Sequence, residues 1–240
     1  MSDRLLVLVV EHEPACPPAH LGTWLTDAGA TLEVCRPWAG DEIPALASYH
    51  AFVVLGGSMG AHDDATTPWL GAVKERIVEA VAAGLPTLGV CLGHQLIAVA
   101  LGGRSEPNPD GQQVGLFEVG WVPEASADDL MRSLATRRRG VQWNSDVVTS
   151  LPDDAVVLAA TSRGELQVAR FAPRVWGIQL HPEVDVPVLQ SWAAGDRDDH
   201  LERGIDQEAI LAEIDAARDE LDEAWRPLAV GFVELAEARR

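Results

Sequence analysis

The sequence is poor in positive charge. Its 240 residues include only 18 lysines and arginines against 37 aspartates and glutamates, which gives a formal net charge of −19. A surface this acidic repels phosphate backbones and anionic lipids, so we expect no binding to nucleic acid or membranes. The short basic run Arg137-Arg138-Arg139 is a local exception and is typical of a solvated loop or helix end.

Long apolar runs and cysteines are also scarce. The longest apolar candidate, Leu5–Val10, has the length of a strand, and it is too short and too close to Met1 to be a secretory signal. The three cysteines, Cys16, Cys35 and Cys91, cannot all pair with one another. A sparse, odd number of cysteines without an export signal is typical of a reducing cytoplasm, where a thiol is free for chemistry.

The first half of the chain alternates short apolar runs with longer amphipathic stretches. The predicted strands are Leu5–Val10, Thr31–Cys35, Ala51–Leu55 and Thr87–Val90, and the predicted helices are Pro18–Ala28, Pro68–Ala83 and Leu92–Leu101. Short strands separated by helices indicate an α/β fold, in which a parallel sheet carries helices on both faces.

After Gly103 the pattern changes to β-type runs separated by Pro, Gly and Asp turns. We expect these runs to extend the same sheet in an antiparallel or mixed manner: Val114–Val122, Ala155–Thr161, Leu166–Phe171 and Val175–Leu180. From about Asp206 to Ala238 the chain is predicted to be helical, with Pro227 separating two helices. The expected organisation is one domain over residues 1–240, with a core over about 4–195 and a helical cover over about 206–238.

The strongest local motif is Gly89-Val90-Cys91-Leu92-Gly93, where an apolar strand ends and a helix begins. This is the layout of a nucleophile elbow, with cysteine in place of serine. The flanking glycines let the strand and helix backbones approach closely, and the N-terminus of the helix favours the thiolate of Cys91. The N–H of Leu92 points to where an oxyanion forms. The alternative for this pentapeptide alone is a small buried cysteine between two packing glycines.

A second motif, Gly177-Ile178-Gln179-Leu180-His181-Pro182-Glu183, places a histidine at the end of another apolar strand. His181 and Glu183 are two residues apart, so in an extended segment their side chains point the same way. The carboxylate then accepts from one imidazole nitrogen and leaves the other for a thiol, as in a nucleophile–base–orienter triad. A His-Pro-Glu turn alone is more often structural, but its combination with Cys91 favours catalysis.

The third motif, Val54-Leu55-Gly56-Gly57-Ser58-Met59-Gly60, is another strand that runs into glycines. The amides of such a turn suit an oxyanion, and Gly57 is the natural donor. Nucleotide phosphates are not indicated, because the full GxGxxG spacing and GxxxxGK[ST] are absent. No metal or other cofactor is expected, since no Cys or carboxylate stands at metal-ligand spacing from His12, His20, His50, His62 or His200.

Taken together, Leu55-Gly56-Gly57, Gly89-Val90-Cys91-Leu92-Gly93-His94-Gln95 and Gly177-Ile178-Gln179-Leu180-His181-Pro182-Glu183 resemble the three signature blocks of class I glutamine amidotransferases, in the same order. The resemblance covers roughly residues 4–190 and is greatest to stand-alone, GMP synthase-like members. It implies a flavodoxin-like, open and mostly parallel sheet with the site at the carboxyl ends of its strands.

The resemblance also implies roles for single residues. Cys91 is the nucleophile, His181 the base and acid, and Glu183 the residue that orients His181. The backbone amides of Gly57 and Leu92 form the oxyanion hole. By the same resemblance, the substrate glutamine contacts Gly56, Gln95 and the backbone around Trp143 and Asn144. Relatives commonly carry His in place of Asn144 and often Glu in place of Gln113, and neither departure affects the triad.

The implied activity is hydrolysis of the side-chain amide of glutamine through a γ-glutamyl thioester on Cys91, with release of ammonia. The acceptor of the ammonia is expected on a separate synthase chain or as a small molecule, because the sequence shows no second catalytic domain. Two alternatives remain open. One is a γ-glutamyl-conjugate hydrolase or cysteine peptidase on the same fold, and the other is a catalytically silent regulatory or binding subunit.

Overall fold

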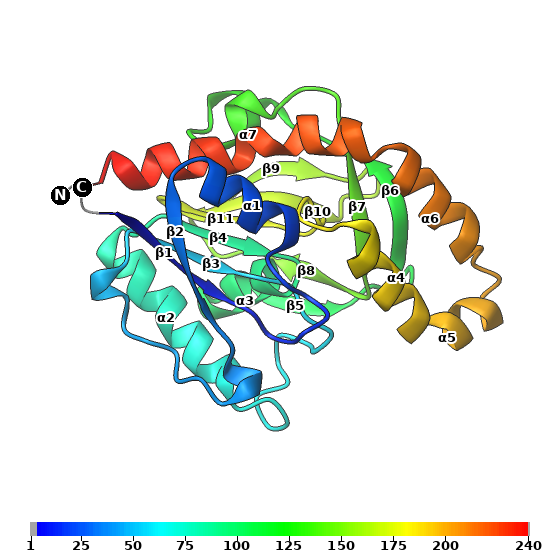
Figure 1. Cartoon of the computed structure of the whole chain (residues 1–240), viewed down its shortest axis with the longest axis horizontal. Coiled ribbons are helices and arrows are strands. Elements are labelled where there is room, and N and C mark those ends of the chain that lie inside the picture. The colour runs from blue at the N-terminus through cyan, green and yellow to red at the C-terminus, as the bar shows by residue number, and fades with distance from the viewer. Residues whose placement is uncertain (1–3, 240) are drawn as a thin grey trace.

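The computed structural model describes residues 4–239 and is built around a seven-stranded sheet with helices on both faces (Figure 1). The strand order is β2-β1-β3-β4-β11-β10-β9. The first five strands in this order are parallel, whereas β10 is antiparallel to both of its neighbours. The flavodoxin-like, mostly parallel α/β sheet predicted from the sequence is therefore confirmed. The strands are β1 (Leu5–Val10), β2 (Ala30–Cys35), β3 (Ala51–Val54), β4 (Thr87–Val90), β9 (Val156–Ala160), β10 (Leu166–Ala172) and β11 (Val175–Ile178).

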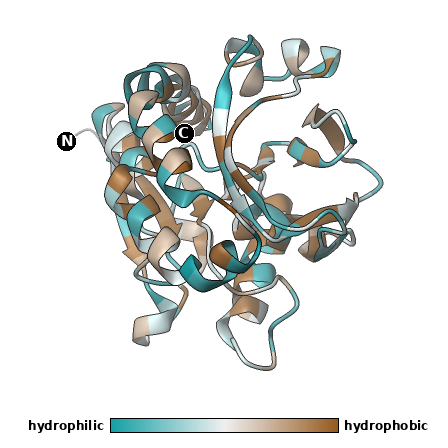
Figure 2. Ribbon diagram, turned by 90° about the vertical axis from the view of Figure 1, so that its right-hand side faces the viewer, coloured by the Kyte–Doolittle hydropathy of each residue, from teal (hydrophilic) through white to brown (hydrophobic). Residues whose placement is uncertain are grey.

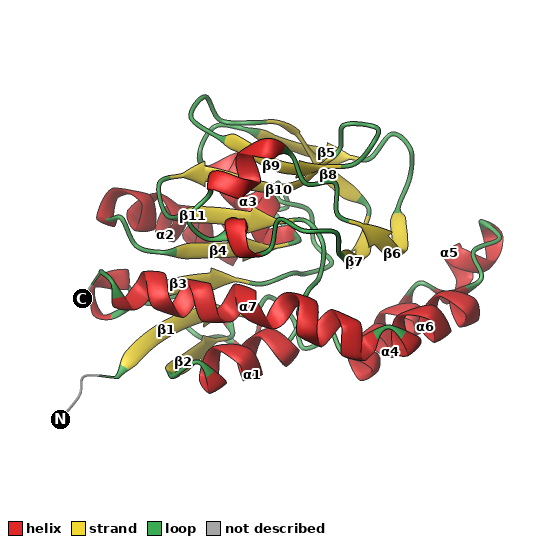
Figure 3. Ribbon diagram, turned by 90° about the horizontal axis from the view of Figure 1, so that it is seen from above, coloured by secondary structure: helices red, strands yellow, loops and turns green. Residues whose placement is uncertain are grey.

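Alternating apolar side chains give the sheet two buried faces. In β1, Val7 and Val9 belong to one core cluster, whereas Leu8 and Val10 belong to another. Helices α1 and α7 cover the first face, and α2 and α3 cover the second (Figure 3). Hydrophobic residues are concentrated on the central strands between these layers (Figure 2). The helices are α1 (Ala19–Asp27), α2 (Trp69–Ala83), α3 (Leu92–Ala100), α4 (Val186–Gly195), α5 (Arg197–Glu202), α6 (Gln207–Ala216) and α7 (Arg218–Glu237).

The prediction that Pro227 separates two helices was wrong. Helix α7 runs through Pro227 for 20 residues, and the break lies earlier, at Ala217 between α6 and α7. Proline removes one N–H donor from a helix but does not always end it. Trp225 and Leu228, on either side of Pro227, are both fully buried in the core, and we attribute the continuity of the helix to this packing. No helix within residues 4–239 has the length and apolar character of a membrane span.

The run Val114–Val122 was also misplaced, since it does not extend the central sheet. Its first part forms β6, which pairs only with β7 in a two-stranded antiparallel sheet. A second antiparallel pair is formed by β5 and β8, which precede β6 and follow β7 in the sequence. The main sheet meets β7 through a single bridge between Val141 and His181. The additional strands are β5 (Arg104–Pro107), β6 (Gln113–Glu118), β7 (Arg139–Asn144) and β8 (Asp146–Ser150).

The basic run is not simply a solvated loop, contrary to the prediction. Arg138 donates to the carbonyl oxygen of Ala224 and lies over the ring of Trp225, at 5.5 Å from its centroid. Arg139 pairs with Glu213 and Glu220, at 3.4 Å and 2.6 Å. The charge pattern alone could not reveal this, because these partners lie more than seventy positions later in the chain. The run therefore attaches the last two helices to β7.

Close backbone contact explains the glycine that follows Cys91 in the elbow motif. A Cβ atom on Gly93 would lie 2.0 Å from the carbonyl oxygen of Val54 in β3. Backbone atoms of a central strand cannot move away easily, so Gly93→Ala is expected to lower the free energy of unfolding by about 1–3 kcal/mol or more. Chemical denaturation of this variant, with Gly195→Ala as an uncrowded control, measures the effect. An unchanged midpoint would contradict the account.

Candidate active site

Cys91 lies between the end of β4 and the first residue of α3. Its backbone has φ 50° and ψ −105°, an unusual conformation for a residue other than glycine. Its N–H donates to the carbonyl oxygen of Ile178 in β11, at 2.8 Å. The strand–turn–helix context of a nucleophile elbow is thus present, with the strained residue at the position of the cysteine.

His181 and Glu183 follow β11, the strand next to β4. His181 Nδ1 lies 2.7 Å from Glu183 Oε1, and both side chains are buried. The N–H of His181 donates to Val141 in β7 at 2.7 Å, which fixes the backbone at this point. Glu183 holds one imidazole nitrogen, and His181 and Cys91 line the same cavity, with Gly56 packed against both. The structure therefore brings together the three residues that the sequence predicted as a triad.

The protonation of His181 is determined by its neighbours. Burial alone would lower the pKa of this imidazole, but the negative charge of Glu183, the interaction with Cys91 and hydrogen bonds to both raise it to about 10. His181 is therefore positively charged at neutral pH. An imidazolium beside a thiol stabilises the thiolate, which is the nucleophilic form of cysteine.

Packing holds the imidazole from two further sides. The ring of Trp192 lies 4.6 Å from that of His181, centroid to centroid, and its Nε1 donates to the carbonyl oxygen of Ala15. A Cβ atom on Gly56 would lie 3.1 Å from His181 Cε1 and 3.6 Å from Cys91 Cβ. Gly56 thus lies against both catalytic candidates, where a larger residue would press on the ring.

The predicted oxyanion donors lie beside Cys91. Gly57 follows Gly56 after β3, and a Cβ atom on Gly57 would lie 3.0 Å from Leu92 Cδ2. The carboxylate of Glu13, three residues after β1, binds Ser58, which follows Gly57 in this loop. It accepts from Ser58 N at 2.6 Å and from Ser58 Oγ at 2.9 Å. Sequence reasoning assigned Glu13 no role, because nothing local indicates that it reaches a loop 45 positions away.

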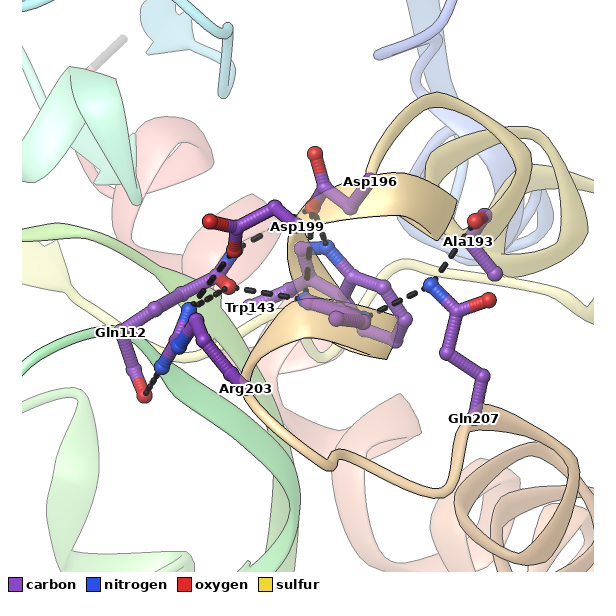
Figure 4. A network of polar contacts seen from close by, with 8 residues as sticks. Gln112, Trp143, Ala193, Asp196, Asp199, Arg203 and Gln207 are labelled. Carbon is purple, nitrogen blue, oxygen red and sulfur yellow. Dashed lines mark hydrogen bonds and ion pairs between the residues drawn. The ribbon is translucent and has the colours of Figure 1, made fainter.

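These side chains surround one cavity of about 540 Å³. Cys91 and His181 line it together with three of the predicted substrate-contacting residues, Gln95, Trp143 and Asn144. Another wall comes from α4, which the sequence did not predict as a helix, and from Asp196, which lies between α4 and α5. Figure 4 shows how Asp196 fixes this wall. Its Oδ2 accepts from Trp143 Nε1 at 2.8 Å and from Gln112 Nε2 at 3.2 Å.

The similarity of this chain to known proteins agrees with the geometry. Residues 23–188, more than half of the chain, match the family model described as glutamine amidotransferase class-I. The chain belongs to the class I glutamine amidotransferase family. It is 28% identical over 171 residues to the glutamine amidotransferase-like protein YfeJ of Salmonella typhimurium, covering 70% of this chain and 71% of YfeJ.

Other curated proteins are similar over shorter segments. The glutamine-hydrolyzing subunit of GMP synthase from Methanothermobacter thermautotrophicus is 39% identical over 101 residues, 42% of this chain and 52% of the relative. Gamma-glutamyl peptidase 4 of Arabidopsis thaliana is 30% identical over 146 residues, 60% of this chain and 57% of the relative. The chain thus spans about half the length of the GMP synthase subunits that it matches.

The fold is that of solved class I glutamine amidotransferases. A glutamine amidotransferase from Thermotoga maritima superposes with a TM-score of 0.86 at 24% identity, covering 97% of this chain and 99% of the other. A second, from Methylobacillus flagellatus, superposes with a TM-score of 0.83 at 22% identity, covering 97% and 96%.

Two departures from the sequence pattern of class I glutamine amidotransferases contact each other. Asn144 Nδ2 donates to Gln113 Oε1 at 3.1 Å, across the register of β6 and β7. Gln113 Nε2 in turn donates to Glu165 Oε2 at 2.8 Å. A pair of amides here replaces the His and Glu expected from the resemblance. With amides at both positions, this hydrogen bond does not depend on a titratable group.

Sequence reasoning missed one residue that touches the thiol. Gln179 Nε2 lies 3.6 Å from Cys91 Sγ, and its Oε1 accepts from Gln95 Nε2 at 3.3 Å. Gln95, expected to hold glutamine, also donates to the backbone oxygen of Asp146 at 3.0 Å. In the part of the chain that the structure describes, no group of three or more His, Cys, Asp or Glu side chains is placed to hold a metal ion.

The three cysteines differ in their surroundings, so we expect Cys91 to be the only highly reactive thiol. Burial and the charge of Glu13 raise the pKa of Cys16, and burial and Asp41 raise the pKa of Cys35 to about 11. Both therefore remain neutral thiols at pH 7, whereas Cys91 faces an imidazolium. Labelling with a glutamine-like electrophile and peptide mapping should find the adduct on Cys91. Dominant labelling of Cys16 or Cys35 would contradict the assignment.

Proposed function

We propose that the protein is a glutaminase of the amidotransferase type, which hydrolyses the side-chain amide of glutamine with Cys91 as nucleophile. The observation that carries the proposal is the buried imidazole of His181, which Glu183 holds at 2.7 Å and which lines one cavity together with Cys91. The strained elbow backbone and the family membership support it.

The proposed reaction proceeds in two steps. The Cys91 thiolate attacks the amide carbon, and the amides of Gly57 and Leu92 stabilise the resulting oxyanion. Protonated His181 donates its proton to the leaving nitrogen, so ammonia departs and a γ-glutamyl thioester remains on Cys91. Neutral His181 then accepts a proton from water, whose oxygen attacks the thioester. Collapse of the second tetrahedral intermediate releases glutamate and regenerates Cys91.

Glu13 has a positioning role in this proposal, because it holds Ser58 and thereby orients the peptide that precedes it. Glu13→Ala is expected to lower kcat about 10- to 100-fold, with little change in KM, since losing one oxyanion donor outright costs about 10²–10³. Ser58→Ala is the matched control, because it keeps the bond from Ser58 N to Glu13. A Glu13→Ala variant with unchanged kcat would contradict this role.

We further propose that the ammonia passes to an acceptor on a separate synthase chain, or to a small molecule in the cavity. The similarity to the glutamine-hydrolyzing subunits of GMP synthases supports a two-chain arrangement. Three unpaired cysteines suit a reducing compartment such as the cytoplasm. The test is ammonia release from glutamine by the purified chain, alone and with candidate synthases. Slow basal turnover raised by a partner supports the proposal, and fast turnover that no partner changes favours a free-standing hydrolase.

A second candidate is hydrolysis of γ-glutamyl conjugates, which the similarity to gamma-glutamyl peptidase 4 favours. Both activities form the same thioester, so the intermediate does not distinguish them. The relative rates on glutamine and on γ-glutamyl amines do. Absence of turnover on both, together with a Cys91 that resists alkylation, would instead indicate a silent regulatory subunit.

A further inference from the structure

The thiol of Cys91 has a buried hydrogen-bond donor beside it that does not belong to the triad. Gln179 directly follows β11, and its Nε2 donates to Cys91 Sγ at 3.6 Å. Its backbone is fixed, because its N–H donates to the carbonyl oxygen of Gln167 in β10 at 2.8 Å. Only 1% of Gln179 is exposed, and it is not among the residues that line the cavity. Gln179 therefore touches the sulfur from within the protein.

A chain of hydrogen bonds determines which end of the Gln179 amide faces the sulfur. The backbone carbonyl oxygen of Asp146 can only accept, so the Gln95 atom at 3.0 Å from it is the nitrogen Nε2. Gln95 Nε2 can only donate, so its second partner, at 3.3 Å, is the oxygen Oε1 of Gln179. The nitrogen of Gln179 is left for Cys91. The sulfur thus faces an N–H donor, which favours the thiolate over the neutral thiol.

The negative charge on Sγ changes twice during the proposed reaction. It is lost when the sulfur bonds to the amide carbon. It returns when the second tetrahedral intermediate collapses: the C–S bond breaks, its electron pair passes to Sγ, the oxyanion becomes a carbonyl again and glutamate leaves. A donor beside the sulfur therefore stabilises the reactant of the first step and the leaving group of the second.

The two steps respond differently to such a donor. During formation of the thioester two effects oppose each other, since more of the thiol is ionised but each thiolate is less nucleophilic. During hydrolysis of the thioester only the favourable effect remains, because a better stabilised thiolate leaves faster.

We propose that Gln179 is a catalytic residue that accelerates hydrolysis of the thioester by donating a hydrogen bond to the departing thiolate of Cys91. The inference rests on the proposed amide hydrolysis at Cys91 and assigns a role in its second step to a residue outside the triad and the oxyanion donors.

Gln179→Met tests this role, because methionine keeps the length of the side chain but has no N–H donor. Gln95 Nε2 retains its bond to the carbonyl oxygen of Asp146, so it keeps a partner. We expect thioester hydrolysis to slow about tenfold, the low end for one hydrogen bond to a charged group. Its rate constant is kcat divided by the fraction of enzyme that acid-quenched samples hold as thioester at saturating glutamine. The value of kcat/KM, which reports thioester formation, should stay within about threefold.

Gln167→Met is the matched control. Gln167 is a similarly buried glutamine on the neighbouring strand, and its Oε1 accepts from the N–H of Gly120 at 2.8 Å. This variant loses a buried hydrogen bond of its own but should leave both steps within about twofold. Equal losses in both steps of Gln179→Met would show a structural role instead, and an unchanged rate of thioester hydrolysis would overturn the inference.

Alkylation of Cys91 by iodoacetamide tests the same hydrogen bond without turnover. The thiolate is the reactive form, so the rate rises with pH until the thiol is ionised. In Gln179→Met the midpoint of this rise should lie about 1 pH unit higher than in the wild type, and in Gln167→Met it should not move. An unmoved midpoint in Gln179→Met would refute the hydrogen bond. If the wild type does not hydrolyse glutamine, the proposed function itself fails, whereas turnover with an unchanged rate of thioester hydrolysis refutes only the inference.

Discussion

Replacement of Cys91 by alanine is expected to reduce glutamine hydrolysis by about 10⁴-fold or more, which is the scale of losing the nucleophile of a triad. Cys35 does not line the cavity, and Cys16, which does, is kept a neutral thiol because burial and the charge of Glu13 raise its pKa, so neither is expected to substitute for Cys91. Steady-state ammonia release measures the loss, and binding of glutamine should be largely retained because the cavity walls are unchanged.

Cys35→Ala is the matched control for this variant. Cys35 is also a buried free cysteine, but it lies at the end of β2, and the only described hydrogen bond of its side chain is to the carbonyl oxygen of Glu42. Its activity should stay within about twofold of wild type. A Cys91→Ala protein that keeps turning over glutamine would remove the basis of the proposed chemistry.

The second large effect is expected at Glu183. Glu183→Gln should lower kcat by several orders of magnitude, yet by at least about tenfold less than Cys91→Ala or His181→Ala. The carboxylate orients and polarises the imidazole, whereas the thiol and imidazole exchange the bonds and protons themselves. A Glu183→Gln protein as inactive as the Cys91→Ala protein would give this carboxylate a larger role than orientation.

The pH dependence of kcat/KM tests whether Glu183 also raises the pKa of His181, in addition to orienting its ring. The pKa of His181 is raised to about 10, so the imidazolium is present at neutral pH and is lost as the pH rises through that value. The alkaline limb of kcat/KM should therefore lie near pH 10 in the wild type. Glu183→Gln removes the main influence that raises this pKa, so the limb should move down by about 1–3 pH units. An unchanged limb would show that another group controls the alkaline loss of activity.

Much of the fold could be predicted because its signals are local. The strands of the parallel sheet are short apolar runs, and β1 begins and ends as predicted. The segment β6–β7 was harder. Strand β7 carries Gly140, Gln142 and Asn144 among its apolar residues, so its sequence lacks a clear alternation, and only its pairing with β6 and the bridge at His181 define it.

The candidate triad could be predicted because each member lies in a distinctive short motif at a strand end. The walls of the cavity could not, because they depend on long-range packing. Trp192 lies in a helix that no motif marked, Asp196 directly follows that helix, and Glu13 acts on a residue 45 positions away.

The most direct test of the central claim is to trap the covalent intermediate. The purified protein is mixed with glutamine, quenched in acid during turnover and mapped by peptide mass spectrometry. Acid preserves a thioester by keeping the deacylating base protonated. The account predicts one γ-glutamyl group on the peptide that contains Cys91, and its absence from the Cys91→Ala protein. Turnover without an adduct on that peptide, or an adduct on Cys16 or Cys35, would contradict the account.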